Sequence, residues 1–223
     1  GVNDPGWNTV ISNAVFNVTN ALGQLYTDGA REILVGNLPS LGEIPLFRGT
    51  PAGFSAYLDS KVALFNSTLA SAVTNLMQQQ PGLRIYILDD NALFNGILSA
   101  PTAQGFTVTT NGALEDSNLT DKSFNGPGAS YVFWDSIHPT TKLHALIGAA
   151  AFNRVAVQLN IVHSGTNFTL SVSNLYPGFS YGIQSSTNLV DWSNYNAFSA
   201  GGINATMTLT NGAGGRVFYR MTY

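Results

Sequence analysis

The hydrophobic positions between residues 5 and 26 recur with the 3.6-residue period of a helix that buries one face. The same period predicts further helices at about 54–77, at about 92–98 and from about Pro139 onward. Short apolar runs predict two buried strands, at 32–35 and 84–88, and the stretch 99–130 is expected to be irregular. Apolar strands that alternate with helices are typical of a parallel sheet flanked by helices. Two strands would leave most of such a sheet's edge unpaired, so we expect an incomplete α/β domain over residues 1–158.

The pattern changes after Asn160. Apolar and polar residues then alternate with period two, as in 168–173, and turn residues separate these runs at intervals of about ten residues. We therefore predict about five strands that form a small antiparallel β-sandwich over residues 166–223. The boundary between the two domains is expected near residues 158–166.

Composition narrows the class of protein. Apolar residues make up 44% of the chain, which excludes a disordered protein, whereas charged residues make up only 9%. The net charge of −3 and the lack of a basic cluster argue against nucleic-acid binding. No apolar run approaches the roughly 18 residues of a membrane span, so no transmembrane segment is predicted. The low charge and the many Asn, Ser and Thr residues favour a bacterial protein that is secreted to the outside of the cell or to the periplasm.

Metal and cofactor chemistry finds little support. Cysteine is absent, which excludes disulfides, a thiol nucleophile and thiolate metal sites. His138 and His144 lack the i,i+4 spacing of a helical zinc pair. Asp89 and Asp90 follow a strand, where a turn or a helix cap is the favoured role, and no glycine-rich phosphate loop opens a helix. We expect no metal and no cofactor.

One segment carries candidate catalytic chemistry. Asp135 precedes His138 by three residues at the junction between a loop and the last helix. A histidine that acts as a general base needs a partner that fixes its tautomer, and a carboxylate that accepts from Nδ1–H does so. On a tight turn this spacing lets the two side chains meet and leaves Nε2 for a nucleophile. The alternative is that Asp135 caps the helix and His138 is an ordinary surface residue.

Three sequence blocks follow one another along the chain: Gly1-Val2-Asn3-Asp4, the stretch 37–45 that begins Asn-Leu-Pro-Ser-Leu-Gly, and the stretch 133–140, Phe-Trp-Asp-Ser-Ile-His-Pro-Thr. In this order they resemble the GDSL (SGNH) esterases and lipases, with the plant GDSL lipases and the bacterial phospholipase/lecithinase/hemolysin-type proteins as the closest branch. The resemblance extends from residue 1 to about residue 157. It implies a flavodoxin-like, three-layer α/β/α domain around a parallel sheet, which hydrolyses esters.

The resemblance also implies roles for three residues. His138 corresponds to the catalytic base, Asp135 to the residue that orients it, and Asn3 to the side chain that donates to the oxyanion. The family's Gly-Asp-Ser-Leu block, which carries the nucleophilic serine, does not occur in the chain, and neither does a Gly-x-Ser-x-Gly elbow. The candidates Ser60, Ser117 and Ser136 lie in the wrong order or context.

We therefore expect a fragment that begins at the third family block. The full-length protein would be a serine ester hydrolase, whereas this chain alone would be inactive and would also lack the second oxyanion donor. The substrate would be a small-molecule or lipid ester. The second hypothesis is a non-catalytic extracellular binding or surface protein, which keeps the remnant of a hydrolase domain beside its β module.

The C-terminal module has a resemblance of its own. Residues 181–192, with Phe218-Tyr219-Arg220, resemble a small β domain found at the ends of secreted bacterial proteins. Trp192, Tyr181 and Tyr219 could line a face that contacts carbohydrate or a cell surface, but a role in the core of the module is favoured.

Overall fold

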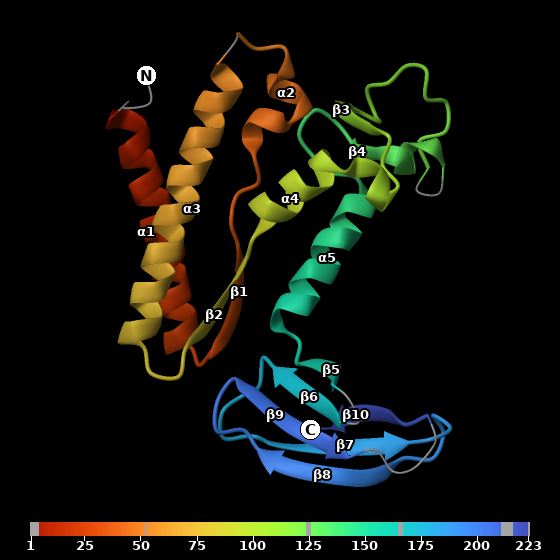
Figure 1. The fold of residues 1–223 in the computed structure, drawn as a ribbon. Coiled ribbons are helices and arrows are strands. Elements are labelled where there is room, and N and C mark those ends of the chain that lie inside the picture. Colours follow the sequence, from red (N-terminus) through yellow and green to blue (C-terminus); the bar gives the residue numbers. More distant parts are fainter. Residues whose placement is uncertain (1–4, 52, 124–125, 165–166, 211–215, 223) are drawn as a thin grey trace. The chain divides into compact units, whose positions relative to one another are not determined.

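The buried apolar side chains gather into three clusters, two within residues 1–154 and one within residues 155–223. The computed structural model describes residues 5–51, 53–123, 126–164, 167–210 and 216–222. The chain divides after Arg154 into two units (Figure 1). The first unit combines helices with short strands, and the described part of the second unit consists of strands and the turns between them.

The elements of the first unit largely follow the predicted order. Its helices are α1 (Pro5–Thr27), α2 (Pro45–Arg48), α3 (Phe54–Gln79), α4 (Asp90–Ser99) and α5 (Thr141–Val155), the last ending on the first residue of the second unit. Its strands are β1 (Glu32–Gly36), β2 (Arg84–Leu88), β3 (Val108–Gly112) and β4 (Tyr131–Phe133). Three short 3-10 helices are η1 (Leu41–Glu43), η2 (Pro101–Gln104) and η3 (Pro127–Ser130). The helices and the two strands that the hydrophobic pattern predicts are all confirmed.

Helices α1 and α3 pack together with the first sheet. Strand β1 pairs with β2 in parallel, with Glu32 opposite Arg84 and Gly36 opposite Leu88. Val15 of α1 and Leu69 of α3 belong to one cluster with side chains of β2. The amphipathic faces seen in the sequence therefore bury themselves against a parallel sheet, as expected.

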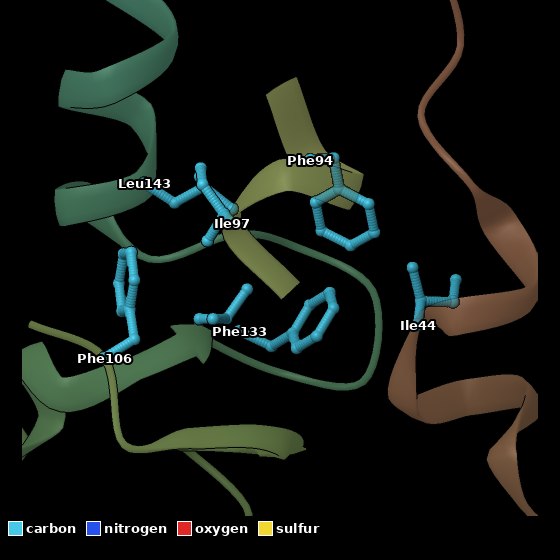
Figure 2. Packing of buried hydrophobic residues seen from close by; sticks show 7 residues of the cluster. Ile44, Phe94, Ile97, Phe106, Phe133 and Leu143 are labelled. Carbon is cyan, nitrogen blue, oxygen red and sulfur yellow. The ribbon is translucent and has the colours of Figure 1, made fainter. Parts of the chain in front are cut away.

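The second cluster supports the segment that carries the candidate chemistry. Figure 2 shows Phe133 of β4 among Phe94 and Ile97 of α4, Leu143 of α5 and Ile44. The rings of Phe94 and Phe133 pack edge to face, with their centroids 5.8 Å apart. All three residues of β4 are buried, so the strand holds the start of the following loop in a fixed position.

The expectation that the first unit has two strands is wrong, because β3 and β4 form a second parallel pair. Strand β3 lies within the stretch 99–130 that was expected to be irregular, and β4 follows directly after that stretch. Strand β3 is a Val-Thr-Thr-Asn-Gly segment with little apolar character, and β4 has three residues. Neither is long enough to show a period. The two parallel pairs are separate sheets in the described residues.

The second unit contains two antiparallel sheets of three strands. One has the order β5–β6–β9 and the other β10–β7–β8. The bounds are β5 (Gln158–Ser164), β6 (Asn167–Ser173), β7 (Ser180–Ser186), β8 (Ser193–Ser199), β9 (Asn204–Thr210) and β10 (Phe218–Thr222). Both sheets contribute to one apolar cluster, for example through Leu170 of β6 and Ile183 of β7.

The boundary and the number of strands differ from expectation. Six strands are described, because β5 lies in the stretch 158–166 that was expected to separate the domains. It pairs with β6 along its whole length, so it belongs to the second unit. Its sequence, Gln-Leu-Asn-Ile-Val-His-Ser, contains one short run with period two, which is hard to recognise because the helical pattern of α5 comes shortly before it.

Candidate active site

The candidate residues lie on a loop, 134–140, that connects β4 to α5 (Figure 1). The loop is closed at its base by backbone hydrogen bonds. Trp134 N–H donates to the His138 carbonyl at 2.7 Å, and Thr140 N–H donates to the Val132 carbonyl at 2.9 Å. An antiparallel bridge between Phe133 and Pro139 lies between these bonds. The chain therefore makes a tight turn, which brings the residues between 134 and 138 close together.

Asp135 is the centre of this turn. Its Oδ1 accepts hydrogen bonds from the backbone N–H groups of Ile137 at 2.8 Å and His138 at 2.6 Å. Its Oδ2 lies 2.8 Å from Nδ1 of the His138 ring. The carboxylate thus fixes both the backbone and the imidazole of the same residue. When Nδ1 carries the hydrogen that points to Asp135, Nε2 of a neutral ring is left as an acceptor.

The hydrogen bonds also set the charge state of Asp135. The backbone N–H of His138, then that of Ile137, then the His138 ring stabilise the ionised form and lower the pKa of Asp135 from 3.8 to about 2. The side chain of Asp135 is 25% exposed, whereas that of His138 is 70% exposed. A permanently ionised carboxylate thus lies behind an imidazole that is open to solvent.

Helix α5 has a different cap from the one considered in the sequence. The buried Thr140 Oγ1 donates to the Tyr131 carbonyl at 2.9 Å and accepts from Leu143 N–H at 3.4 Å. Asp135 makes no bond to the helix, so the described contacts favour the pairing with His138 over the alternative of a helix cap.

Gly112, the last residue of β3, lies in close contact with the turn. A Cβ atom at this position would lie 2.6 Å from both Cα and the carbonyl carbon of Asp135, far inside van der Waals contact. The loop after β3 adds backbone bonds, from Ala113 N–H to the Phe133 carbonyl at 3.0 Å and from Leu114 N–H to the Trp134 carbonyl at 2.7 Å. No local sequence pattern marks Gly112, because its contact with Asp135 arises from tertiary structure.

Two of the cavities that adjoin the loop share Pro139. The first has a volume of about 140 Å³ and is almost entirely apolar, with lining side chains that include Ile137, Phe94 and Leu143. The second is an open cleft of about 410 Å³, which His138 lines together with polar residues. Pro139 and Ile137 thus separate an apolar pocket from a polar cleft.

The block 37–45 is held by a network of amide side chains. Leu38 N–H donates to Asn66 Oδ1, and the Leu38 carbonyl accepts from Asn66 Nδ2, both at 2.9 Å. Asn91 N–H donates to Asn37 Oδ1 at 3.0 Å. This network fixes the backbone at the carboxyl ends of β1 and β2, and Pro39 and Ile44 of the block line the apolar pocket.

Of the remaining candidates, Asn3 lies outside the described residues, and neither Ser60 nor Ser136 is hydrogen-bonded to the His138 ring. Ser60 is in α3, where its hydroxyl donates to the Tyr57 carbonyl at 2.6 Å, and Ser136 lies across the turn from His138, where its backbone N–H donates to Glu115 Oε1 at 3.1 Å. Among the described residues, Asp135 is the one hydrogen-bond partner of the His138 ring.

A search of the described residues finds no group of three side chains suited to hold a metal ion. In the same part of the chain, no helix has the length and apolar character needed to span a membrane.

Residues 1–151 match the family model described as GDSL-like Lipase/Acylhydrolase. The chain belongs to this family. Among its relatives in Arabidopsis thaliana, "GDSL esterase/lipase At1g71691" is 30% identical over 64% of this chain and 40% of the relative. "GDSL esterase/lipase APG" is 31% identical over 60% of this chain and 42% of the relative. The chain spans about 40% of the length of the curated relatives that it matches.

The match confirms the GDSL family that the sequence blocks indicate, and the bacterial branch within it stays a prediction. The matched region ends at residue 151, within α5, so it includes the whole loop that carries Asp135 and His138 and leaves the second unit outside.

The pKa of Asp135 gives a first testable prediction. Because its pKa in the folded state lies below the ordinary value, ionised Asp135 stabilises the turn fully above about pH 4, and this contribution is lost as the pH falls through about 2. We expect the amide resonances of Ile137 and His138 to titrate together with a midpoint near 2 in an NMR experiment. The variant Asp135→Asn should lack this titration. A midpoint at or above 3.8 would contradict the hydrogen bonding described.

The close approach of Gly112 to Asp135 gives a second testable prediction. We expect Gly112→Ala to destabilise the first unit by about 1–3 kcal/mol through overpacking. Urea unfolding followed by helical circular dichroism measures this, since the described helices all belong to residues 5–155. Gly128→Ala is a matched control, because a Cβ there would meet its nearest atom, Lys122 Cα, at an ordinary 3.6 Å. Equal unfolding midpoints for the two variants would show that the contact is not tight.

Proposed function

We propose that the first unit provides the base side of the active site of a serine ester hydrolase. The observation that carries the proposal is the bond between Asp135 Oδ2 and His138 Nδ1, in a turn where the carboxylate is fixed and ionised and the imidazole is exposed. Membership of the GDSL-like lipase/acylhydrolase family supports ester bonds as the target.

In this proposal His138 Nε2 takes the proton of a serine hydroxyl as its oxygen attacks the ester carbonyl. Asp135 holds the ring and stabilises the imidazolium that forms. His138 then returns the proton to the departing alcohol. In the second half of the reaction, His138 takes a proton from a water molecule as that water attacks the acyl group, and returns the proton to the serine oxygen. The serine belongs to a Gly-Asp-Ser-Leu segment outside these 223 residues, and the chain alone is inactive.

Asn3 is proposed as the donor to the oxyanion. Its place in the Gly-x-Asn-Asp block supports this role, and a neutral amide is well suited to stabilise a developing negative charge. The second donor is proposed to be a glycine of the family's second block, which also lies outside these 223 residues. The domain that this segment completes is proposed to be a three-layer α/β/α sandwich.

The apolar pocket fits the acyl side of an ester. It lies against Ile137 and Pro139, the two chain neighbours of His138, and its walls are aliphatic and aromatic except for Asp90. Its volume of about 140 Å³ resembles that of an apolar cavity that admits benzene, roughly 150 Å³. A short apolar acyl chain is therefore the proposed occupant.

The second unit, residues 155–223, is proposed to be a β-sandwich appendage on a secreted bacterial protein whose hydrolase domain includes residues 1–154. The low charge of the chain supports export. Contact with carbohydrate or a cell surface would involve Trp192, because Tyr181 is 2% exposed in the core cluster and Tyr219 packs, partly buried, against the same cluster.

A test of the catalytic role uses the coding sequence that surrounds these 223 codons. We expect it to encode a Gly-Asp-Ser-Leu segment ahead of residue 1, and the product to hydrolyse short-chain p-nitrophenyl esters. His138→Ala should then lower kcat by about 10⁴- to 10⁶-fold, because the serine loses its base. His163→Ala, in β5 of the second unit, is the control and should keep the parent activity.

A wild-type rate for His138→Ala would rule out the proposed base. A reading frame that starts at or near Gly1 would instead favour the second hypothesis, a non-catalytic extracellular binding or surface protein. In that case a serine-directed phosphonate should label neither the 223-residue chain nor the protein that its natural gene encodes.

A further inference from the structure

Two adjacent carboxylates at the start of α4 have very different surroundings. Asp89 is the N-cap of the helix, and its Oδ1 accepts from Asn37 Nδ2 at 2.9 Å and from Ala92 N–H at 3.0 Å. These bonds lower the pKa of Asp89. Asp90 lines the apolar pocket, and no group of the described residues hydrogen-bonds to its buried Oδ1. The capping role that the sequence favours for this pair therefore falls to Asp89 alone.

The pocket around Asp90 is otherwise apolar. Among the described residues that line it, Asp90 is the one that carries an ionisable group, and the rest are aliphatic, aromatic or proline. Figure 2 shows three of these side chains, Ile44, Phe94 and Phe133. Burial, and then the negative charge of Asp89, raises the pKa of the Asp90 carboxyl. The pocket thus contains a carboxyl group that lacks a hydrogen-bond partner and whose charged form is disfavoured.

Local structure does not explain this position of Asp90. A Cβ atom on Gly36 would lie 2.6 Å from Asp90 Oδ2, so the bare backbone of β1 leaves room for the carboxyl at the pocket. The helix dipole favours a carboxylate in the first turn of α4, but by less than the burial of an unbonded carboxyl costs. A polar group that is buried at such a cost is typical of functional sites.

We propose that Asp90 determines which acyl chain the apolar pocket accepts, because its carboxyl group hydrogen-bonds a hydroxyl group on an otherwise apolar chain. The assignment of the pocket to the acyl side rests on the proposed function, whereas the hydroxyl group is inferred from Asp90. The substrate class is therefore an ester of a hydroxylated carboxylic acid. A site that hydrogen-bonds a hydroxyl rejects the analogue that lacks it, because the buried carboxyl is then left unpaired.

A hydroxyl group suits this carboxyl better than an ammonium group. It both donates and accepts, so it pairs with the ionised and the neutral form of Asp90 alike. An ammonium group requires the ionised form, which burial disfavours, and it would lose its own hydration between apolar walls. The last torsion of an aspartate is broad and roughly two-fold, so a small rotation presents either oxygen to the ligand.

The position of the pocket fits an acyl chain that starts at the catalytic loop. Ile137 and Pro139, the neighbours of His138, line it from the loop, and Asp90 lines it from the carboxyl end of β2. A chain whose ester group lies at His138 would therefore bring its substituents into the reach of Asp90.

The experiment compares esters that differ by a hydroxyl group in place of a methyl group. Ethyl β-hydroxybutyrate is paired with ethyl isovalerate, and ethyl ω-hydroxyhexanoate with ethyl heptanoate, which samples two positions of the hydroxyl. Binding to the 223-residue chain is followed by NMR through the amides of Leu93 and Phe94, without turnover. We expect at least one hydroxylated ester to bind about tenfold more tightly than its partner, as one hydrogen bond to a buried carboxyl should give.

Three variants test the role of the Asp90 side chain. Asp90→Ala should remove the preference by weakening the binding of the hydroxylated ester and not that of its partner. Asp90→Asn should keep a preference, because an amide also donates and accepts. Asp28→Ala is the control. It removes an exposed carboxylate that accepts from Gln24 Nε2 and does not line the pocket, and it should bind like the parent chain.

A measurement on the unaltered chain does not depend on how the variants fold. The side-chain carboxyl carbon resonance of Asp90 should shift when the preferred hydroxylated ester binds and stay in place with its methyl partner. The resonance of Asp89 should respond to neither ester. Ethyl β-aminobutyrate is titrated as well, and it should bind more weakly than the preferred hydroxylated ester.

Equal affinities within both pairs, no saturable binding of any ester, a preference that survives in Asp90→Ala, or tighter binding of the amino ester would overturn the inference. The complete protein separates this result from the proposed function. If the chain prefers a hydroxylated ester while the complete protein cleaves no ester, the proposed function fails and the hydroxyl-binding pocket stands. If the complete protein cleaves both members of each pair with equal kcat/KM, the inference fails and the proposed function stands.

Discussion

The three hydrogen bonds accepted by the Asp135 carboxylate are the constraint on which the candidate site depends. Two come from backbone N–H groups and define the turn, and the third comes from the His138 ring. The same turn brings the chain back to β4, where Thr140 N–H donates to the Val132 carbonyl. In this position Thr140 Oγ1 caps α5. The Asp135 side chain therefore orients the imidazole, and Thr140 at the end of the same turn caps the last helix.

The surroundings keep this turn in one conformation. The buried residues of β4 anchor its first end in the cluster that includes Phe94 and Leu143, and Gly112 lets the backbone of the neighbouring segment approach Asp135 closely. Such support is what a catalytic base needs, because a small misplacement of the ring would weaken proton transfer. The loop also adjoins an apolar pocket and a polar cleft, both of which Pro139 lines.

Much of the fold could be predicted from the sequence, because α1 and α3 are long enough to show several turns of the helical period, and β1 and β2 are short apolar runs between turn residues. Strands β3 and β4 could not, since one is polar and the other has three residues. The Asp135–His138 pair was visible as a local spacing. The cap by Thr140, the packing of Gly112 and the position of Asp90 in the wall of the apolar pocket depend on tertiary contacts, which no local pattern records.

The tautomer of His138 tests the central claim most directly. Long-range nitrogen–proton NMR of the imidazole, recorded on the chain at alkaline pH, distinguishes a neutral ring that is protonated at Nδ1 from one that is protonated at Nε2. The account predicts the hydrogen on Nδ1, directed at Asp135, and a shift toward the Nε2–H form in Asp135→Ala. A ring that carries its hydrogen on Nε2 in the parent chain would contradict the proposed base, because Nε2 could then not accept the proton of a serine.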